Sequence, residues 1–133
     1  MNASIPIRAA CPPGACDCGL DDLLEDPNGD HRVLRLTREE EKRLVARLEN
    51  ITTLADLRRM QARMHELLGI AVSIAPSPNE VRTVRGFSIQ VQACPGLCRK
   101  TRQTIPAAIR RCLERQPEVG YELLNERDLL RDA

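Results

Sequence analysis

Two helix-capping motifs constrain the fold of this chain more than any other feature of its sequence. Thr37 with Glu40, and Thr53 with Asp56, each place a hydroxyl side chain shortly before an acidic one, and such a pair satisfies backbone N–H groups at the start of a helix. Each motif opens a stretch whose apolar residues recur at helical spacing. The first stripe comprises Leu44, Val45, Leu48 and Ile51, and the second comprises Leu54, Leu57, Met60, Met64, Leu67 and Leu68. Because Gly69 provides a stop after the second stripe, we predict two helices that form an antiparallel hairpin.

The apolar period changes from helical to alternating after Gly69. One face of a first strand carries Ile70, Val72 and Ile74, and one face of a second strand carries Phe87, Ile89 and Val91. Alternation of this kind predicts two half-buried strands. We expect the second strand to begin near Val81, with a bulge at Gly86 and a turn at residues 76–79 before it.

The remainder of the chain is predicted to be mainly helical. A third helix is expected to start at Thr104, to contain Pro106 in its first turn and to end before Pro117. A weaker helical segment follows over residues 118–130, and a short helical turn is expected over residues 20–25.

Together these elements predict an α+β fold in which a helical hairpin and C-terminal helices pack on a two-stranded antiparallel β-hairpin. We assign residues 31–133 to a single domain, because 133 residues are typical of one core. Residues 1–30 form a cysteine-rich acidic loop that we expect to be mobile without a ligand. Only Phe87 and Tyr121 are aromatic, so the core must be aliphatic.

The absence of a secretory signal pattern and of a long apolar run predicts a cytoplasmic protein that does not enter a membrane. A reducing compartment keeps thiols reduced, and clustered thiols there indicate metal or redox chemistry rather than disulfides.

The six cysteines are unevenly distributed, and the stretch CPPGACDCG at residues 11–19 contains three of them. Thiolates in loops rich in proline and glycine can wrap a soft metal ion. The candidate ligands are Cys11, Cys16, Cys18, Cys94 and Cys98. These five thiols are one more than a tetrahedral zinc ion requires. Their spacing matches neither the paired C-x2-C motifs of a zinc knuckle nor the plant ferredoxin pattern. We take zinc as the first choice of metal and an iron–sulfur cluster as the second.

Two other interpretations of the cysteines remain open. They can be unligated small apolar residues, or they can form a thiol redox sensor, for which Cys98 beside Arg99 and Lys100 is the best candidate. Cys112 lies on the apolar face of the third predicted helix, which favours a core role. His31 is a potential nitrogen ligand, although a solitary histidine is more often structural.

Charge is also uneven, because residues 1–30 contain one base and six acids whereas residues 81–112 contain seven bases and no acid. The bases are Arg82, Arg85, Arg99, Lys100, Arg102, Arg110 and Arg111. Such a segment can bind anions, nucleic acid or an acidic protein. The acidic loop can instead pair with this basic segment within the chain, which would bring the cysteines of residues 11–19 close to Cys94 and Cys98.

No catalytic arrangement is visible, so we expect a protein that is not an enzyme. The sequence favours a thiolate metal site that supports an interaction surface. The alternatives are a metal-free interaction module that uses the basic segment, and a thiol redox sensor.

Overall fold

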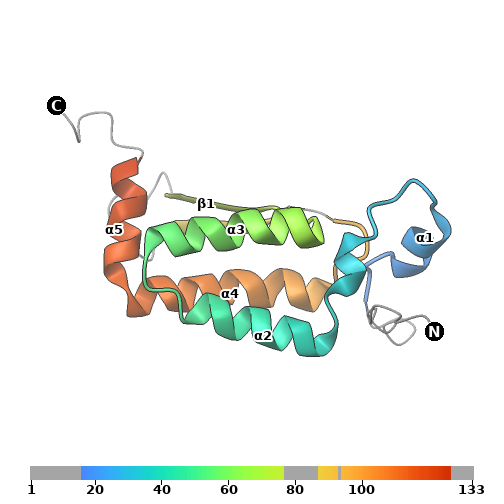
Figure 1. Cartoon of the computed structure of the whole chain (residues 1–133), viewed down its shortest axis with the longest axis horizontal. Helices are drawn as coiled ribbons and strands as arrows, with labels where there is room; N and C mark the ends of the chain where they lie inside the picture. The colour runs from blue at the N-terminus through green and yellow to red at the C-terminus, as the bar shows by residue number, and fades with distance from the viewer. Residues whose placement is uncertain (1–15, 77–86, 93, 127–133) are drawn as a thin grey trace, which may run out of the picture.

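The computed structural model describes residues 16–76, 87–92 and 94–126. Its elements are α1 (Leu20–Glu25), the 3-10 helix η1 (Arg32–Arg35), α2 (Arg38–Glu49), α3 (Leu54–Leu68), β1 (Val72–Pro76), β2 (Phe87–Val91), α4 (Arg99–Arg115) and α5 (Pro117–Glu126). The α4 helix packs against α2, β2 and α5, and α1 and α5 lie at opposite ends of the molecule (Figure 1). The predicted α+β fold with a small β-hairpin is confirmed.

The local signals at the ends of α2 and α3 have the structural effect that the sequence predicted. Thr37 Oγ1 accepts a hydrogen bond from the Glu40 N–H at 3.3 Å, and Thr53 Oγ1 accepts one from the Asp56 N–H at 3.2 Å. Gly69 ends α3 with a φ of 72°, a left-handed conformation in which a side chain is strained. The two helices run antiparallel in Figure 1.

The β-hairpin has the predicted alternation. The strands β1 and β2 pair antiparallel, with Val72 opposite Val91 and Ile74 opposite Ile89. Ile74, Phe87 and Ile89 are buried, as their shared face requires. Pro76, the first residue of the turn predicted at residues 76–79, is instead the last residue of β1, where it pairs with Phe87. The rest of that turn, the strand start near Val81 and the bulge at Gly86 lie outside the described residues.

The α4 helix begins earlier than the sequence predicted. Its first residue is Arg99 rather than Thr104, and Pro106 therefore lies inside the helix. Proline lacks an N–H, so the helix loses the hydrogen bond from position 106 to the Arg102 carbonyl. The first turns form nevertheless, because they bury Thr101 and Ile105 against the core. The α5 helix begins at Pro117, one residue before the predicted segment of residues 118–130, and the last residues of that segment lie outside the described part of the chain.

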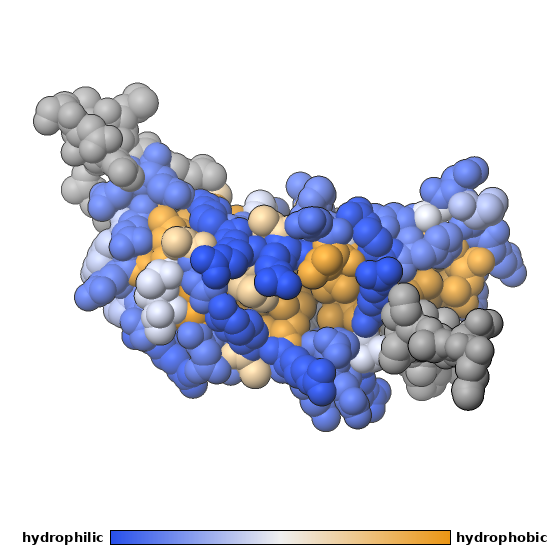
Figure 2. All heavy atoms as spheres, in the orientation of Figure 1, coloured by the Kyte–Doolittle hydropathy of each residue, from blue (hydrophilic) through white to orange (hydrophobic). Residues whose placement is uncertain are grey.

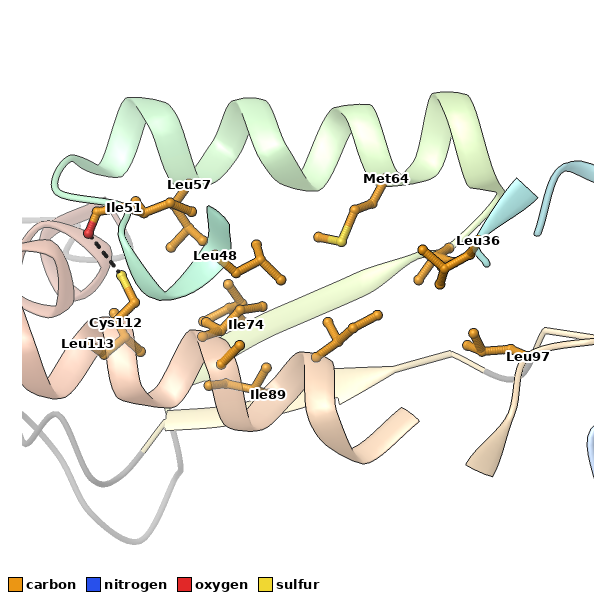
Figure 3. Close-up of a cluster of buried hydrophobic side chains, with 14 of the residues drawn as sticks. Leu36, Leu48, Ile51, Leu57, Met64, Ile74, Ile89, Leu97, Cys112 and Leu113 are labelled. Carbon is orange, nitrogen blue, oxygen red and sulfur yellow. Dashed lines mark hydrogen bonds between the residues drawn. The ribbon is translucent and has the colours of Figure 1, made fainter. Parts of the chain in front are cut away.

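The core is aliphatic apart from Phe87 and lies between the α2, α3 and α4 helices and the sheet (Figure 3). Leu48, Leu57 and Leu113 are fully buried in it. Cys112 is also fully buried, and its thiol donates a hydrogen bond to the Ile51 carbonyl at 3.3 Å. Burial raises the pKa of the Cys112 thiol, so this cysteine is a neutral core residue, as its place on the apolar face predicted.

The N-terminal segment of residues 16–36 extends this core at one end of the molecule. Leu20 and Leu23 of α1 are buried together with Val33 and Leu97. A Cβ atom on Gly96 would lie 2.6 Å from Leu23 Cδ2, so the turn of residues 94–98 packs directly under α1. This packing brings the two cysteine-containing segments to the same place.

Arg32 makes a tertiary helix cap that the sequence did not reveal. Its Nη1 donates hydrogen bonds to the carbonyls of His65 at 3.1 Å and Glu66 at 2.9 Å. These carbonyls belong to the last turn of α3. The His65 carbonyl also accepts from the Gly69 N–H at 3.0 Å, whereas the Glu66 carbonyl is one of the last acceptors, which have no partner within the helix. Asp30 pairs with the same guanidinium at 2.7 Å, so this contact fastens the N-terminal segment to the end of α3.

Across the described residues, none of the helices combines the length and the apolarity that crossing a membrane requires.

Candidate metal centre

Three of the predicted ligands converge where the N-terminal segment meets the start of α4. The sulfur atoms of Cys16, Cys18 and Cys98 all lie within 4.8 Å of one another, and the three side chains are half-buried. Around a tetrahedral zinc ion with Zn–S bonds of about 2.3 Å, neighbouring sulfurs lie about 3.8 Å apart. The sulfur–sulfur distances would therefore have to shorten by about 1 Å or less for all three atoms to coordinate one ion. The three cysteines could hold a metal.

Backbone contacts set the relative position of these cysteines. The Cys18 carbonyl accepts a hydrogen bond from the Gly96 N–H at 2.7 Å, which ties residues 16–18 to the turn before α4. Gly96 has a φ of 88° and almost touches Leu23, so this position requires a residue without a side chain. Cys98 is the N-cap residue of α4.

The first turn of α4 contributes a hydrogen-bond donor to the cysteine group. The backbone N–H of Arg99 donates to Cys16 Sγ at 3.4 Å. The first N–H groups of a helix have no intrahelical partner, and the helix dipole favours negative charge beside them. Since thiolate is the form of cysteine that binds metal, this location suits a ligand sulfur.

An ion pair reinforces the same junction. Asp17, which stands between Cys16 and Cys18, accepts a hydrogen bond from Arg102 Nη2 at 2.8 Å. The Asp17 side chain is 67% exposed and that of Arg102 33% exposed, so solvent screening limits the pair to about 1 kcal/mol or less. The pairing of the acidic N-terminal loop with the basic segment is thus present at this contact, and it coincides with the meeting of the cysteines.

Cys94 is not part of this group. Its thiol is directed to the carbonyls of Gly69 at 3.8 Å and Pro95 at 3.7 Å. Burial raises the pKa of the Cys94 thiol, and the nearby Asp30 carboxylate adds to the rise while Arg32 opposes it. A raised pKa favours the protonated thiol over the metal-binding thiolate. Cys11, the remaining candidate ligand, lies outside the described residues.

His31 has a contact of its own, away from the group of three cysteines. Its Nε2 lies 2.8 Å from the Leu23 carbonyl oxygen. A carbonyl can only accept, so Nε2 carries the proton. The imidazole thereby caps the end of α1.

The basic segment is partly paired within the molecule. Arg102 binds Asp17, and Arg111 pairs with Glu49 of α2. Arg99 and Lys100 are exposed on the first turn of α4, ahead of the helix start predicted at Thr104. Arg110 is exposed beside an open cavity of about 510 Å³. Arg82 and Arg85 lie outside the described residues.

Comparison of the chain with protein-family models, with curated proteins and with solved structures found no match. The function must therefore be inferred from the geometry of the site itself. Sequence patterns had indicated the cysteines as ligands and the charged segments as partners. They gave no sign that the Arg99 N–H would donate to Cys16 Sγ or that Arg32 would hold the N-terminal segment to α3.

Proposed function

We propose that this protein is a cytoplasmic, non-enzymatic metal-binding protein whose site contains Cys16, Cys18 and Cys98. The supporting observation is the convergence of these three sulfurs from two distant parts of the chain. Zinc is the first choice, because three thiolates with one further ligand are a common zinc environment. An iron–sulfur cluster is the second choice, since it also uses cysteine thiolates.

The bound ion would act as a clasp. It would join residues 16–18 to Cys98, the N-cap residue of α4. This junction already contains the Cys18–Gly96 hydrogen bond and the Asp17–Arg102 ion pair. Because the unfolded chain lacks a preformed site, the binding free energy of such an ion adds to the stability of the folded state. The clasp would therefore hold the N-terminal segment in place and support an interaction surface.

A tetrahedral zinc ion would need a fourth ligand, and we assign this role to Cys11. It precedes Cys16 by five positions, and five extended residues span up to about 17 Å, so the connecting chain is long enough. Cys94 is the rival, but its pKa is raised and its thiol is directed to backbone carbonyls.

Metal analysis of the full chain, purified under reducing conditions without chelator, tests this proposal. We expect one zinc ion per chain, or a brown iron-containing sample if a cluster is present. Cys16→Ser with Cys98→Ser should abolish metal binding, whereas the matched control Cys94→Ser should retain it. Cys11→Ser should weaken it if Cys11 is the fourth ligand. Full retention of metal by the Cys16→Ser, Cys98→Ser variant would overturn the proposal.

A redox function is the second candidate, because the same sulfur proximity favours disulfide formation. Hydrogen peroxide would oxidise two of the three thiols, forming one S–S bond and releasing two molecules of water. The sulfurs would have to approach to about 2.05 Å, and the disulfide would remove two metal ligands. Peroxide should then release the metal and leave a disulfide between two of these cysteines, which peptide mapping by mass spectrometry can identify.

A further inference from the structure

A groove of about 650 Å³ lies between α2 and α3, on the side of the molecule seen in Figure 2. In that view, apolar surface is visible between the hydrophilic surfaces of the two helices. The apolar residues that line this α2/α3 groove are Leu36, Leu44, Met60, Met64, Leu67 and Leu68. The groove is separate from the cysteine group, and the clasp does not account for it.

The groove is open because the two helices direct much of their apolar surface elsewhere. The α2 helix packs against α4, and α3 packs against η1 and α5. Leu36 and Met64 are buried at the groove, but Leu44, Met60 and Leu68 are only partly buried and Leu67 is 45% exposed. A contiguous exposed apolar patch with a polar rim is typical of a surface that binds a partner.

The shape of the groove suits a helix. Both of its long walls are helical, and the α3 wall extends from Met60 to Leu68, which corresponds to about 12 Å of helix. A partner helix would lay an apolar stripe of about two turns along such a groove. The flexible side chains of Met60 and Met64 can adapt to the shape of that stripe.

The charged rim determines which helix would fit. Four arginines and two glutamates line the groove: Arg35, Arg43, Arg47, Arg63, Glu39 and Glu40. Arg43 neutralises Glu40 at 3.2 Å, and Arg47 pairs with Asp56 at 2.7 Å. Arg35, Arg63 and Glu39 have no ion pair within the described residues. These three side chains leave a net charge of +1 on the rim, so it favours a ligand with negative charge.

We propose that the α2/α3 groove binds an amphipathic helix of a partner protein, with aliphatic residues on one face and acidic residues along its flanks. This assigns a location to the interaction surface in the proposed function, and only in that respect does it rest on that function. Arg35 and Leu36, which line the groove, are the last two residues of the N-terminal segment of residues 16–36 that the metal would clasp.

Two synthetic peptides provide the test. Both are capped, have the same length and the same leucine positions, and differ only in having glutamate or lysine at every polar position. Titration calorimetry with the full-length protein should show that the acidic peptide binds at least about tenfold more tightly than the basic one. Leu67→Glu should weaken binding of the acidic peptide by at least about tenfold, because it places a charge on the apolar lining.

Matched variants separate the groove from general surface effects. Arg63→Glu should reduce the preference for the acidic peptide, whereas Tyr121→Glu should leave binding unchanged, because Tyr121 is a similarly exposed side chain on α5, outside the groove. Circular dichroism checks that each variant is folded. Equal affinity for the two peptides in the wild-type protein, or unchanged binding by Leu67→Glu, would overturn the inference.

Two further measurements separate a partner helix from a second copy of the chain and from an effect of the metal. If sedimentation shows a dimer that Leu67→Glu dissociates, the groove binds a second copy and the proposal of a partner helix is wrong. Metal analysis of the same samples distinguishes the groove proposal from the metal-site proposal. Binding of the acidic peptide by protein that contains no metal would support the groove without supporting the metal site. Metal-loaded protein that binds neither peptide would overturn the groove and leave the metal site standing.

Discussion

Asp17 and Arg102 form an ion pair at 2.8 Å although they lie 85 positions apart in the chain. Asp17 stands between two of the converging cysteines, and Arg102 belongs to the first turns of the helix that Cys98 caps. Charge pairing and sulfur convergence therefore occur at one junction.

Removal of this ion pair should weaken metal binding without abolishing it. In Asp17→Asn, Arg102 loses its carboxylate partner, and we expect the metal affinity to fall by about two- to fivefold, the equivalent of about 1 kcal/mol or less for an exposed pair. Competition with a chromogenic chelator measures the affinity. The difference from wild type should shrink as salt is added; an equal affinity at low salt would contradict the expectation. Asp21→Asn, on an exposed acid of the same segment, is the control.

Gly96→Ala should destabilise the protein. The substitution places a Cβ atom 2.6 Å from Leu23 Cδ2 in a residue with a φ of 88°, so it adds a clash to backbone strain. We expect the free energy of unfolding to fall by about 1–3 kcal/mol, as measured by urea denaturation. Gly19→Ala is the matched control, because Gly19 has a φ of 70° but no atom lies within 4 Å of the position that its Cβ would occupy. Equal losses in the two variants would mean that the contact with Leu23 has no part in the effect.

Chelation of the metal should loosen the N-terminal segment before the rest of the fold. An ion that binds only the folded state stabilises it by about 4 kcal/mol when present at roughly a thousand times its dissociation constant. Hydrogen exchange should therefore show that chelator increases exchange in residues 16–36 and near Gly96, while the amides of β1 and β2 remain protected. The Cys16→Ser, Cys98→Ser variant should not respond to chelator. A chelator effect of the same size in that variant would contradict the clasp.

The stability of the metal-free protein should decline in acid in part because of Asp30. Hydrogen bonds from Arg32 lower the pKa of the Asp30 carboxyl from its usual 3.8 to about 2. Because the folded-state pKa lies below the unfolded one, this stabilisation is present above about pH 4 and is lost as pH falls towards about 2. The side chain is 45% exposed, so we expect a contribution below about 1 kcal/mol. In Asp30→Asn, the free energy of unfolding measured by urea denaturation should depend less on pH over this range. An unchanged pH profile would show that the contact contributes nothing.

The helices and strands could be predicted largely from the sequence, because their signals are local. A hydroxyl at Thr37 or Thr53 acts on an N–H three residues away, Gly69 needs only its own φ, and the alternation in β2 reflects which face each residue occupies. The start of α4 was predicted wrongly, since Pro106 is typical of a first turn and the burial of Thr101 and Ile105 that extends the helix is a tertiary effect.

The candidate site could be predicted only in part. Cysteine clustering indicated soft-metal chemistry, and the opposite charges of the two segments indicated that they could meet. Only the tertiary structure decided that Cys98 joins Cys16 and Cys18, that Cys94 is directed to Gly69, and that the Arg99 N–H donates to a sulfur. The physical reason is range: capping and periodicity depend on neighbours within a few residues, whereas sulfur positions depend on how Leu23 packs over Gly96, a contact between residues far apart in the chain.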